Sequence, residues 1–186
     1  MIVLVVGLAI FIGVHLFREF GIRAHLVDKQ GEPRYKGIFS LLALTGLGLI
    51  IYGKSIAPFL TIWVPAYELR SVTHLLMLPA WILVMAGNLP HSIIKSTVSH
   101  PMLLGVIVWG CSHLLANGDL ASLLLFGSLV LFSTVKIITA QKTDKTAMKP
   151  ASLKWDFVAI VSGFVLYGIV LVFHGQLFGV GLSLTS

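Results

Sequence analysis

The sequence predicts an all-α fold, a polytopic membrane bundle of about six transmembrane helices. Hydrophobic residues make up 57% of the 186 residues and charged residues only 11%, and the mean hydropathy of +0.98 is far above that of soluble domains. The apolar residues gather in runs close to the roughly 20 residues that a helix needs to cross the bilayer core. The runs lack the alternating pattern of a membrane β-barrel. We therefore expect one transmembrane domain, residues 1–186.

The predicted helices are 2–20, 37–57, 70–87, 101–117, 119–141 and 155–179. The first has no basic segment before it and no small-residue cleavage site after it, so we expect it to remain as a helix and not to be removed as a signal peptide. Pro101 suits the first turn of the fourth helix, where a missing N–H is harmless. Asn117-Gly118-Asp119 predicts a tight turn, with Asn or Gly in the left-handed conformation and Asp119 as the N-cap of the fifth helix.

Basic residues predict the orientation, because cytoplasmic loops carry more Lys and Arg than outer loops. The link from Pro58 to Tyr67 has neither and holds Trp63, an aromatic residue that suits the opposite headgroup region. Both termini are then periplasmic in a bacterial inner membrane. The net charge of +6 reflects this bias and an attraction to the lipid bilayer, and does not indicate a nucleic-acid partner. The links expected in the cytoplasm hold Arg18, Arg23, Lys29, Arg34 and Lys36, and Lys142, Lys145, Lys149 and Lys154.

Histidines are the unusual polar residues of the predicted helices. Ionisable groups are costly in a membrane and usually face a bundle interior or a functional cavity. All seven acidic residues lie in links or at helix ends, which weakens a proton-transporter interpretation. Imidazole serves as a proton relay, a hydrogen-bond partner or a metal ligand, and the residues alone leave the choice open. The candidates are His15, His74, His113 and His174, with His25, His91 and His100 nearer the expected cytoplasmic ends.

Small residues surround His113 on its predicted helix. Gly110 precedes it by three residues, and Trp109 and Asn117 lie four residues on either side, so they share its face. Together with Gly105 they predict space beside the imidazole for a flat group. The alternative is that small residues let neighbouring helices approach closely. The single cysteine, Cys111, excludes an intrachain disulfide and is expected to be a small apolar residue of the helix.

Residues 100–128, HPMLLGVIVWGCSHLLANGDLASLLLFGS, closely resemble the signature of the NnrU family: a histidine-proline pair, a tryptophan, an alanine-histidine pair and an asparagine-glycine-aspartate turn. The segment 31–37, GEPRYKG, is similar to the family's glycine-glutamate element. The resemblance covers most of the chain and is least distinctive in the last helix. Two positions depart from the pattern, because Ser99 replaces the usual arginine and Ser112 the usual alanine. Losing the arginine removes one candidate partner for a propionate.

The resemblance implies a cofactor, because this family is related to the 15-cis-zeta-carotene isomerases, membrane proteins that hold heme b. Their axial histidines correspond to His15 and His113 here. The predicted helix boundaries place these two residues at different depths, unless the first helix runs past Glu19. If the boundaries hold, His15 with His100, or His74 with His113, are the alternative pairs. The propionate partners implied by charge and position are Arg18, Arg23 and Arg34.

Three functions remain open. NnrU proteins are linked to nitrite and nitric oxide reduction, which implies a heme protein with a sensing, redox or assembly role and nitrogen-oxide respiratory proteins as partners. The kinship to the isomerases implies instead a heme-dependent cis-trans isomerase of a lipid-soluble, carotenoid-like polyene. The third possibility is a heme-free structural bundle. No catalytic residue is assigned.

Overall fold

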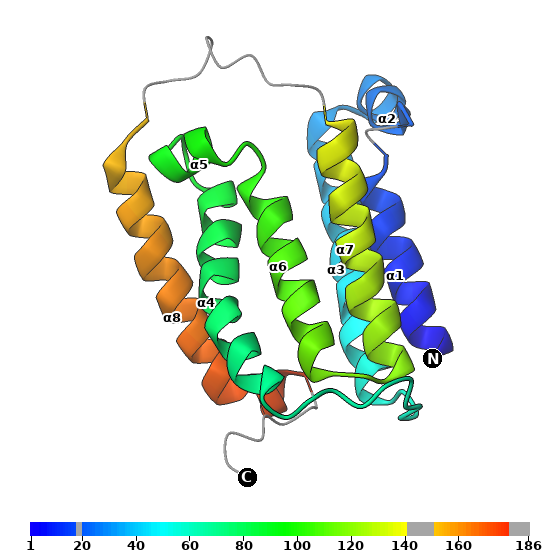
Figure 1. Ribbon diagram of the computed structural model, residues 1–186. Helices are drawn as coiled ribbons and strands as arrows, with labels where there is room; N and C mark the ends of the chain where they lie inside the picture. The colour runs from blue at the N-terminus through cyan, green and yellow to red at the C-terminus, as the bar shows by residue number, and fades with distance from the viewer. Residues whose placement is uncertain (18–19, 141–150, 179–186) are drawn as a thin grey trace. The chain divides into compact units, whose positions relative to one another are not determined.

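The computed structural model describes residues 1–17, 20–140 and 151–178 (Figure 1). Its elements there are the helices α1 (Ile2–His15), α2 (Ile22–Gln30), α3 (Glu32–Ser55), α4 (Leu69–Asn88), α5 (Ile93–Thr97), α6 (Pro101–Ala116), α7 (Leu120–Thr139) and α8 (Leu153–Phe178). Four of them, α3, α4, α7 and α8, are long and apolar enough to cross a membrane, and α1 and α6 are shorter apolar helices. The predicted all-α fold with about six apolar helices is confirmed.

The first helix is shorter than predicted. It ends at His15, so the expected run 2–20 and its extension past Glu19 are wrong. The backbone N–H of Phe17 donates to the carbonyl of Val14 at 3.3 Å, a tight closing turn. The chain then enters α2 through Gly21, whose φ of 70° favours glycine. Hydropathy could not find this end, because apolar side chains after a helix satisfy the same pattern as those within it.

Two helices, α2 and α5, were not predicted, because α2 is polar and α5 has only five residues. In α2 most side chains are exposed, and its Arg23 contacts Glu32 of α3 at 3.6 Å. Glu32 also pairs with Lys36 at 3.2 Å, one helical turn further along α3. The helix α3 corresponds to the predicted helix 37–57. It begins at Glu32, five residues earlier than expected, with Pro33 in its first turn.

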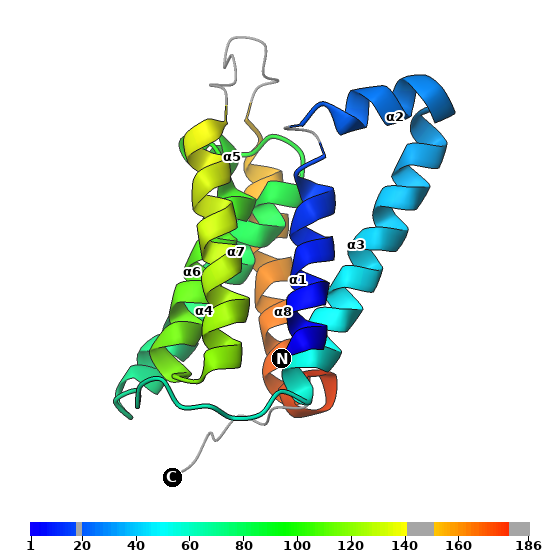
Figure 2. The same cartoon turned by 90° about the vertical axis from the view of Figure 1, so that its right-hand side faces the viewer.

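The chain divides into two compact units, Met1–Leu60 and Thr61–Ser186. In the first unit α1 and α3 pack side by side (Figure 2). The pairing depends on glycine: a Cβ added at Gly46 would lie 2.9 Å from the backbone N of Phe11, and one at Gly53 would overlap the backbone of Leu4. Glycine at these two positions therefore lets α1 and α3 approach closely. The prediction of a single domain stays a prediction.

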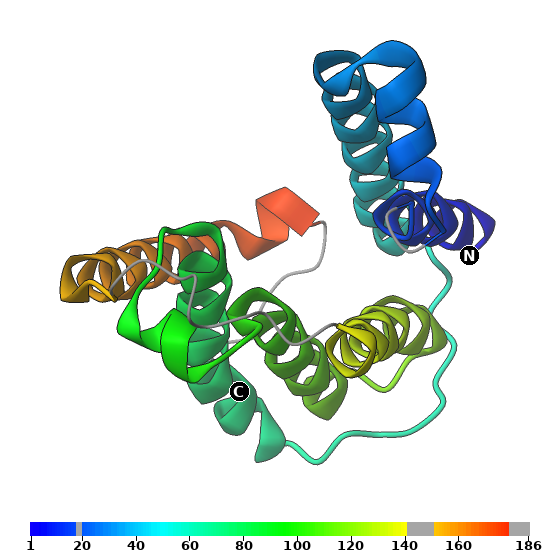
Figure 3. The same cartoon turned by 90° about the horizontal axis from the view of Figure 1, so that it is seen from above.

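In the second unit α7, α6, α4 and α8 stand in a row, each antiparallel to its neighbour (Figure 3). A Cβ at Gly163 of α8 would lie 2.9 Å from the backbone of Ile82 in α4. Close backbone packing therefore also joins α4 to α8. The short α5 packs against α4 and α8.

At one end of this row, the turn Asn117-Gly118-Asp119 joins α6 to α7. Asp119 is the N-cap of α7, as predicted, and its carboxylate accepts from the backbone N–H of Ser122 at 3.0 Å. The expected left-handed conformation is wrong, because within the described residues only Gly21 and Gly31 have positive φ. Glycine is required at position 118 because there is no room for a side chain. The Gly118 carbonyl accepts from Ile62 and Trp63, and a Cβ there would overlap the carbonyl of Trp63.

At the other end, Asp156 of α8 holds α5 in place. Its two carboxylate oxygens accept from the backbone N–H groups of Ile93 and Ile94, each at 2.9 Å. The Asp156 side chain is buried, and Ser92, the N-cap of α5, accepts from the backbone N–H of Lys95 at 3.2 Å. The N–H groups that open α5 therefore have acceptors.

Candidate functional site

His113 lies one turn before the end of α6, with a half-buried side chain. Its Nδ1 lies 2.8 Å from the carbonyl oxygen of Trp109. Because a carbonyl oxygen only accepts, Nδ1 carries the proton and Nε2 keeps a lone pair. Within the described part of the chain no hydrogen bond to this Nε2 is formed. This is the arrangement in which imidazole binds a metal through Nε2.

Aromatic rings hold the His113 imidazole in this orientation. The ring of Phe126, from α7, stacks on it with a centroid distance of 4.4 Å and an interplanar angle of 23°. Trp109 lies 4.9 Å away on the same helix and contacts the edge of Phe126. Phe126 is the contact that the sequence did not reveal, because it depends on how α7 is turned against α6.

Two more histidines lie near His113. His74 of α4 and His174 of α8 are close enough for their charges to interact with it. The hydroxyl of Tyr167, also in α8, donates to the His74 carbonyl at 3.3 Å. No group of three or more His, Cys, Asp or Glu side chains suited to a metal ion occurs among the described residues. The His74 and His113 pair therefore remains an alternative, in which both residues belong to the same unit.

His15 has the same local geometry as His113, although it belongs to the other unit. It is the last residue of α1, and its Nδ1 lies 2.6 Å from the carbonyl of Phe11, four residues earlier. Phe11 lies 4.4 Å from its ring and Phe39 of α3 lies 5.2 Å away. Each histidine thus has an aromatic residue at position i−4 and a second one on the adjacent helix. The i−4 aromatics could have been read from the sequence.

The expected space for a flat group at Gly105 and Gly110 is not there. A Cβ on Gly105 would lie 2.8 Å from the carbonyl oxygen of Ala80 in α4, and one on Gly110 would lie 2.5 Å from Val130 in α7. Neighbouring helices occupy both positions, so the alternative of close helix approach is correct. Any ligand of His113 must approach from another side of the imidazole.

The comparison with known proteins adds one finding, that the model of the NnrU protein family matches residues 3–182. The chain belongs to the NnrU family. The match includes both units and reaches from α1 to the end of α8. No curated protein and no solved structure matches the chain.

The two departures from the NnrU pattern have different surroundings. Ser112 is fully buried, and its hydroxyl donates to the Val108 carbonyl at 2.6 Å. The Ser112 carbonyl accepts from Thr73 of α4 at 2.9 Å. This serine therefore fits the helix interface where the family has alanine. Ser99 is exposed and lines a pocket together with Lys95, so the missing arginine is replaced by a neutral side chain beside a cation.

The remaining predicted residues of this NnrU chain are His100, Arg34 and Arg18. His100 is the N-cap of α6, thirteen residues away, which is about 20 Å along the helix. His100 therefore cannot share one iron with His113, and its pairing with His15 stays a prediction. Arg34 is exposed in the first turn of α3 and forms no ion pair with the described residues. Arg18 lies outside the described residues.

Proposed function

We propose that this chain is a heme b-binding integral membrane protein with a sensing, redox or assembly role in nitrite and nitric oxide metabolism. The observation that carries the proposal is the His113 imidazole, fixed by the Trp109 carbonyl and the Phe126 ring with its Nε2 lone pair available. Membership of the NnrU family supports the metabolic setting, and the apolar helices support a place in the bilayer.

The side chains present suit the cofactor. A neutral imidazole that donates its Nδ1–H to a carbonyl is a usual axial ligand of heme iron, because this hydrogen bond fixes the tautomer and the ring orientation. Heme b would supply an iron that changes oxidation state and binds nitric oxide. His113 is the first proposed ligand. His15, which repeats its geometry, is the proposed second ligand, and His74 is the alternative.

Basic side chains would hold the propionates. Arg34 is available for this in the first turn of α3, whereas Arg23 is already paired with Glu32 and lies 5.7 Å from the Tyr35 ring. Arg18 remains a proposed partner by its position in the sequence. A guanidinium would bind a propionate through two parallel hydrogen bonds.

The test is the heme content of detergent-purified protein, measured by the pyridine hemochrome method and by oxidised and dithionite-reduced absorption spectra. We expect about one heme b per chain. His113→Ala should lose the heme or change its Soret band, and His15→Ala and His74→Ala should identify the second ligand. His25→Ala is the matched control, because His25 is an exposed histidine of α2. An unchanged spectrum in His113→Ala would refute the ligand assignment, and no Soret band in heme-supplemented cells would refute heme binding.

The role of the heme needs a separate measurement on the same samples. A sensing or redox role predicts that nitric oxide shifts the Soret band of the reduced protein, and an assembly role predicts that a nitrite or nitric oxide reductase copurifies. If nitric oxide leaves the Soret band unchanged and no reductase copurifies, this part of the proposal is contradicted. Conversion of 15-cis-zeta-carotene after reduction with dithionite would assign the isomerase activity instead.

A further inference from the structure

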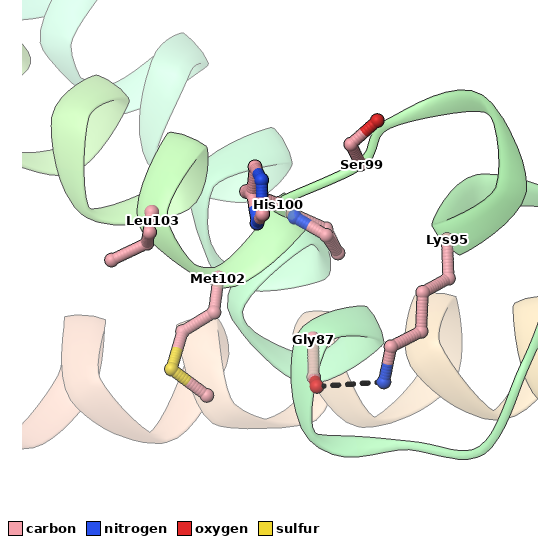
Figure 4. Close-up of a pocket in the computed structure, with 7 residues that line it drawn as sticks. Gly87, Lys95, Ser99, His100, Met102 and Leu103 are labelled. Atoms are coloured by element: carbon pink, nitrogen blue, oxygen red, sulfur yellow. Dashed lines mark hydrogen bonds between the residues drawn. The ribbon is translucent and has the colours of Figure 1, made fainter. Parts of the chain in front are cut away.

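A pocket of about 190 Å³ lies between the end of α4 and the start of α6, with α5 at its side (Figure 4). Its polar lining is the ammonium of Lys95, the hydroxyl of Ser99 and the imidazole of His100, and its apolar lining comes from the first turn of α6. It lies at the opposite end of α6 from His113, so it is separate from the proposed heme site. The residues that matter here are Gly87, Lys95, Ser99, His100, Met102 and Leu103.

Lys95 brings an uncompensated positive charge to this pocket. Its Nζ donates to the carbonyls of Gly87 at 3.0 Å and Leu89 at 2.8 Å. An ammonium has three N–H donors, so one remains. Both partners are neutral, and Lys95 forms no ion pair with a carboxylate among the described residues. A half-buried cation with neutral partners favours an anion nearby.

The start of α6 adds further donors. His100 is the N-cap and its side chain forms no capping hydrogen bond. Pro101 has no N–H, and Leu104 donates to the His100 carbonyl at 3.0 Å. The N–H groups of Met102 and Leu103 therefore have no partner within the helix. A cation on one side and a helix N-terminus on the other make this pocket electropositive.

The position of the pocket indicates which anion it takes. The end of the unit that holds α5 also carries Lys136 in the last turn of α7 and Lys154 in the first turn of α8. The α5 end also holds the acidic Asp156 in the first turn of α8, and the other end carries the acidic Glu68 and Asp119 with one basic residue, Arg70 of α4. By the excess of positive charge, the α5 end faces the cytoplasm, where the leaflet contains anionic lipids. The pocket then lies at the level of their headgroups.

We propose that this pocket binds the phosphate of an anionic phospholipid, with Lys95 and His100 as its polar contacts and Met102 beside the start of the acyl chains. The inference goes beyond the proposed heme function and does not depend on it. Phosphate is common to lipids and to soluble anions, and the exposed apolar side chain of Met102 favours the lipid.

The test is native mass spectrometry of the delipidated full-length protein titrated with phosphatidylglycerol or phosphatidylcholine. We expect one phosphatidylglycerol to bind before all others and phosphatidylcholine to bind more weakly. Lys95→Gln should weaken that first binding by about fivefold or more, since one basic residue near an anionic surface contributes about this factor. Lys154→Gln removes the same charge from an exposed position at the same end and should leave the first binding unchanged.

Further variants separate binding from folding, because Lys95 also caps carbonyls at the end of α4. Lys95→Arg should restore the first binding, and His100→Gln should weaken it without touching those carbonyls. Equal loss in Lys95→Gln and Lys154→Gln would overturn the proposal, since only the overall charge would then matter. Displacement of the lipid by millimolar inorganic phosphate would also overturn it, in favour of a soluble anion. Each readout is lipid occupancy, so neither outcome depends on heme content.

Discussion

Asp156 is a buried acidic residue in the first turn of the apolar helix α8, and its carboxylate is stabilised there by hydrogen bonds. Both of its carboxylate oxygens are used by backbone N–H groups of α5, and its side chain is only 8% exposed. Such a carboxylate contributes to stability because it satisfies donors that would otherwise be buried without a partner. Asp156 therefore fixes α5, and with it the Lys95 side of the lipid pocket, to α8.

Replacing Asp156 by Ala should lower the free energy of unfolding by about 1–3 kcal/mol, because two N–H groups lose their acceptor. The measurement is unfolding of the purified protein in detergent, followed by circular dichroism. Glu68→Ala is the control, because Glu68 is exposed and forms no capping hydrogen bond at the start of α4. Equal stability of the two variants would show that the Asp156 hydrogen bonds do not contribute.

At the scale of helices, glycine decides how closely α4, α6, α7 and α8 pack. Gly105 and Gly163 face backbone atoms of α4, whereas the Cβ position of Gly168 in α8 has no neighbour within 4 Å. The same residue type therefore has opposite roles on the helices of one unit. In lipid, where apolar burial contributes little to helix association, the close van der Waals packing that small residues permit is one of the sources of attraction.

Gly105→Ala should destabilise the protein by about 1–3 kcal/mol, because its Cβ meets the Ala80 carbonyl and the Val84 backbone, which cannot move aside like a flexible side chain. Gly168→Ala adds the same methyl group in open space and should be neutral or stabilise by up to about 1 kcal/mol through helix propensity. Detergent unfolding of both variants makes the comparison. Destabilisation of Gly168→Ala to the same extent would argue against the packing explanation.

For the whole molecule, the distribution of charge sets the orientation in the membrane. We propose that the α5 end of the second unit faces the cytoplasm and that the segment before α4 faces the periplasm of a bacterial inner membrane. Lys95, Lys136 and Lys154 lie at the first end. The segment 61–69 at the other end contains no basic residue and carries Trp63 and Tyr67. With six crossings, both termini would then be periplasmic.

Cysteine labelling tests this orientation. Cys111 is exposed on α6 and must first be replaced by Ser. In that background a membrane-impermeant maleimide should label Ala66→Cys in intact spheroplasts, because the segment before α4 faces outward. Thr97→Cys, in α5, should react only after the membrane is opened. The reverse pattern would invert the proposed topology and place the lipid pocket in the outer leaflet.

The sequence by itself determined the helical class and the approximate positions of the apolar helices, together with local features such as Pro101 in the first turn of α6 and the Asp119 cap. These depend on hydropathy and on hydrogen bonds within a few residues. It also led to the NnrU family and to His15 and His113, whose aromatic neighbours at i−4 are part of the local sequence.

Only the tertiary structure decided what each helix face contacts. It showed that Gly105 and Gly110 are filled by neighbouring helices, that Phe126 stacks on His113, and that His100 lies at the far end of α6. The physical reason is that α6 is apolar on all sides. A helix in lipid has no polar stripe to distinguish its buried face from its exposed one, so the rotation of each helix is fixed by side-chain and backbone contacts that no local pattern records.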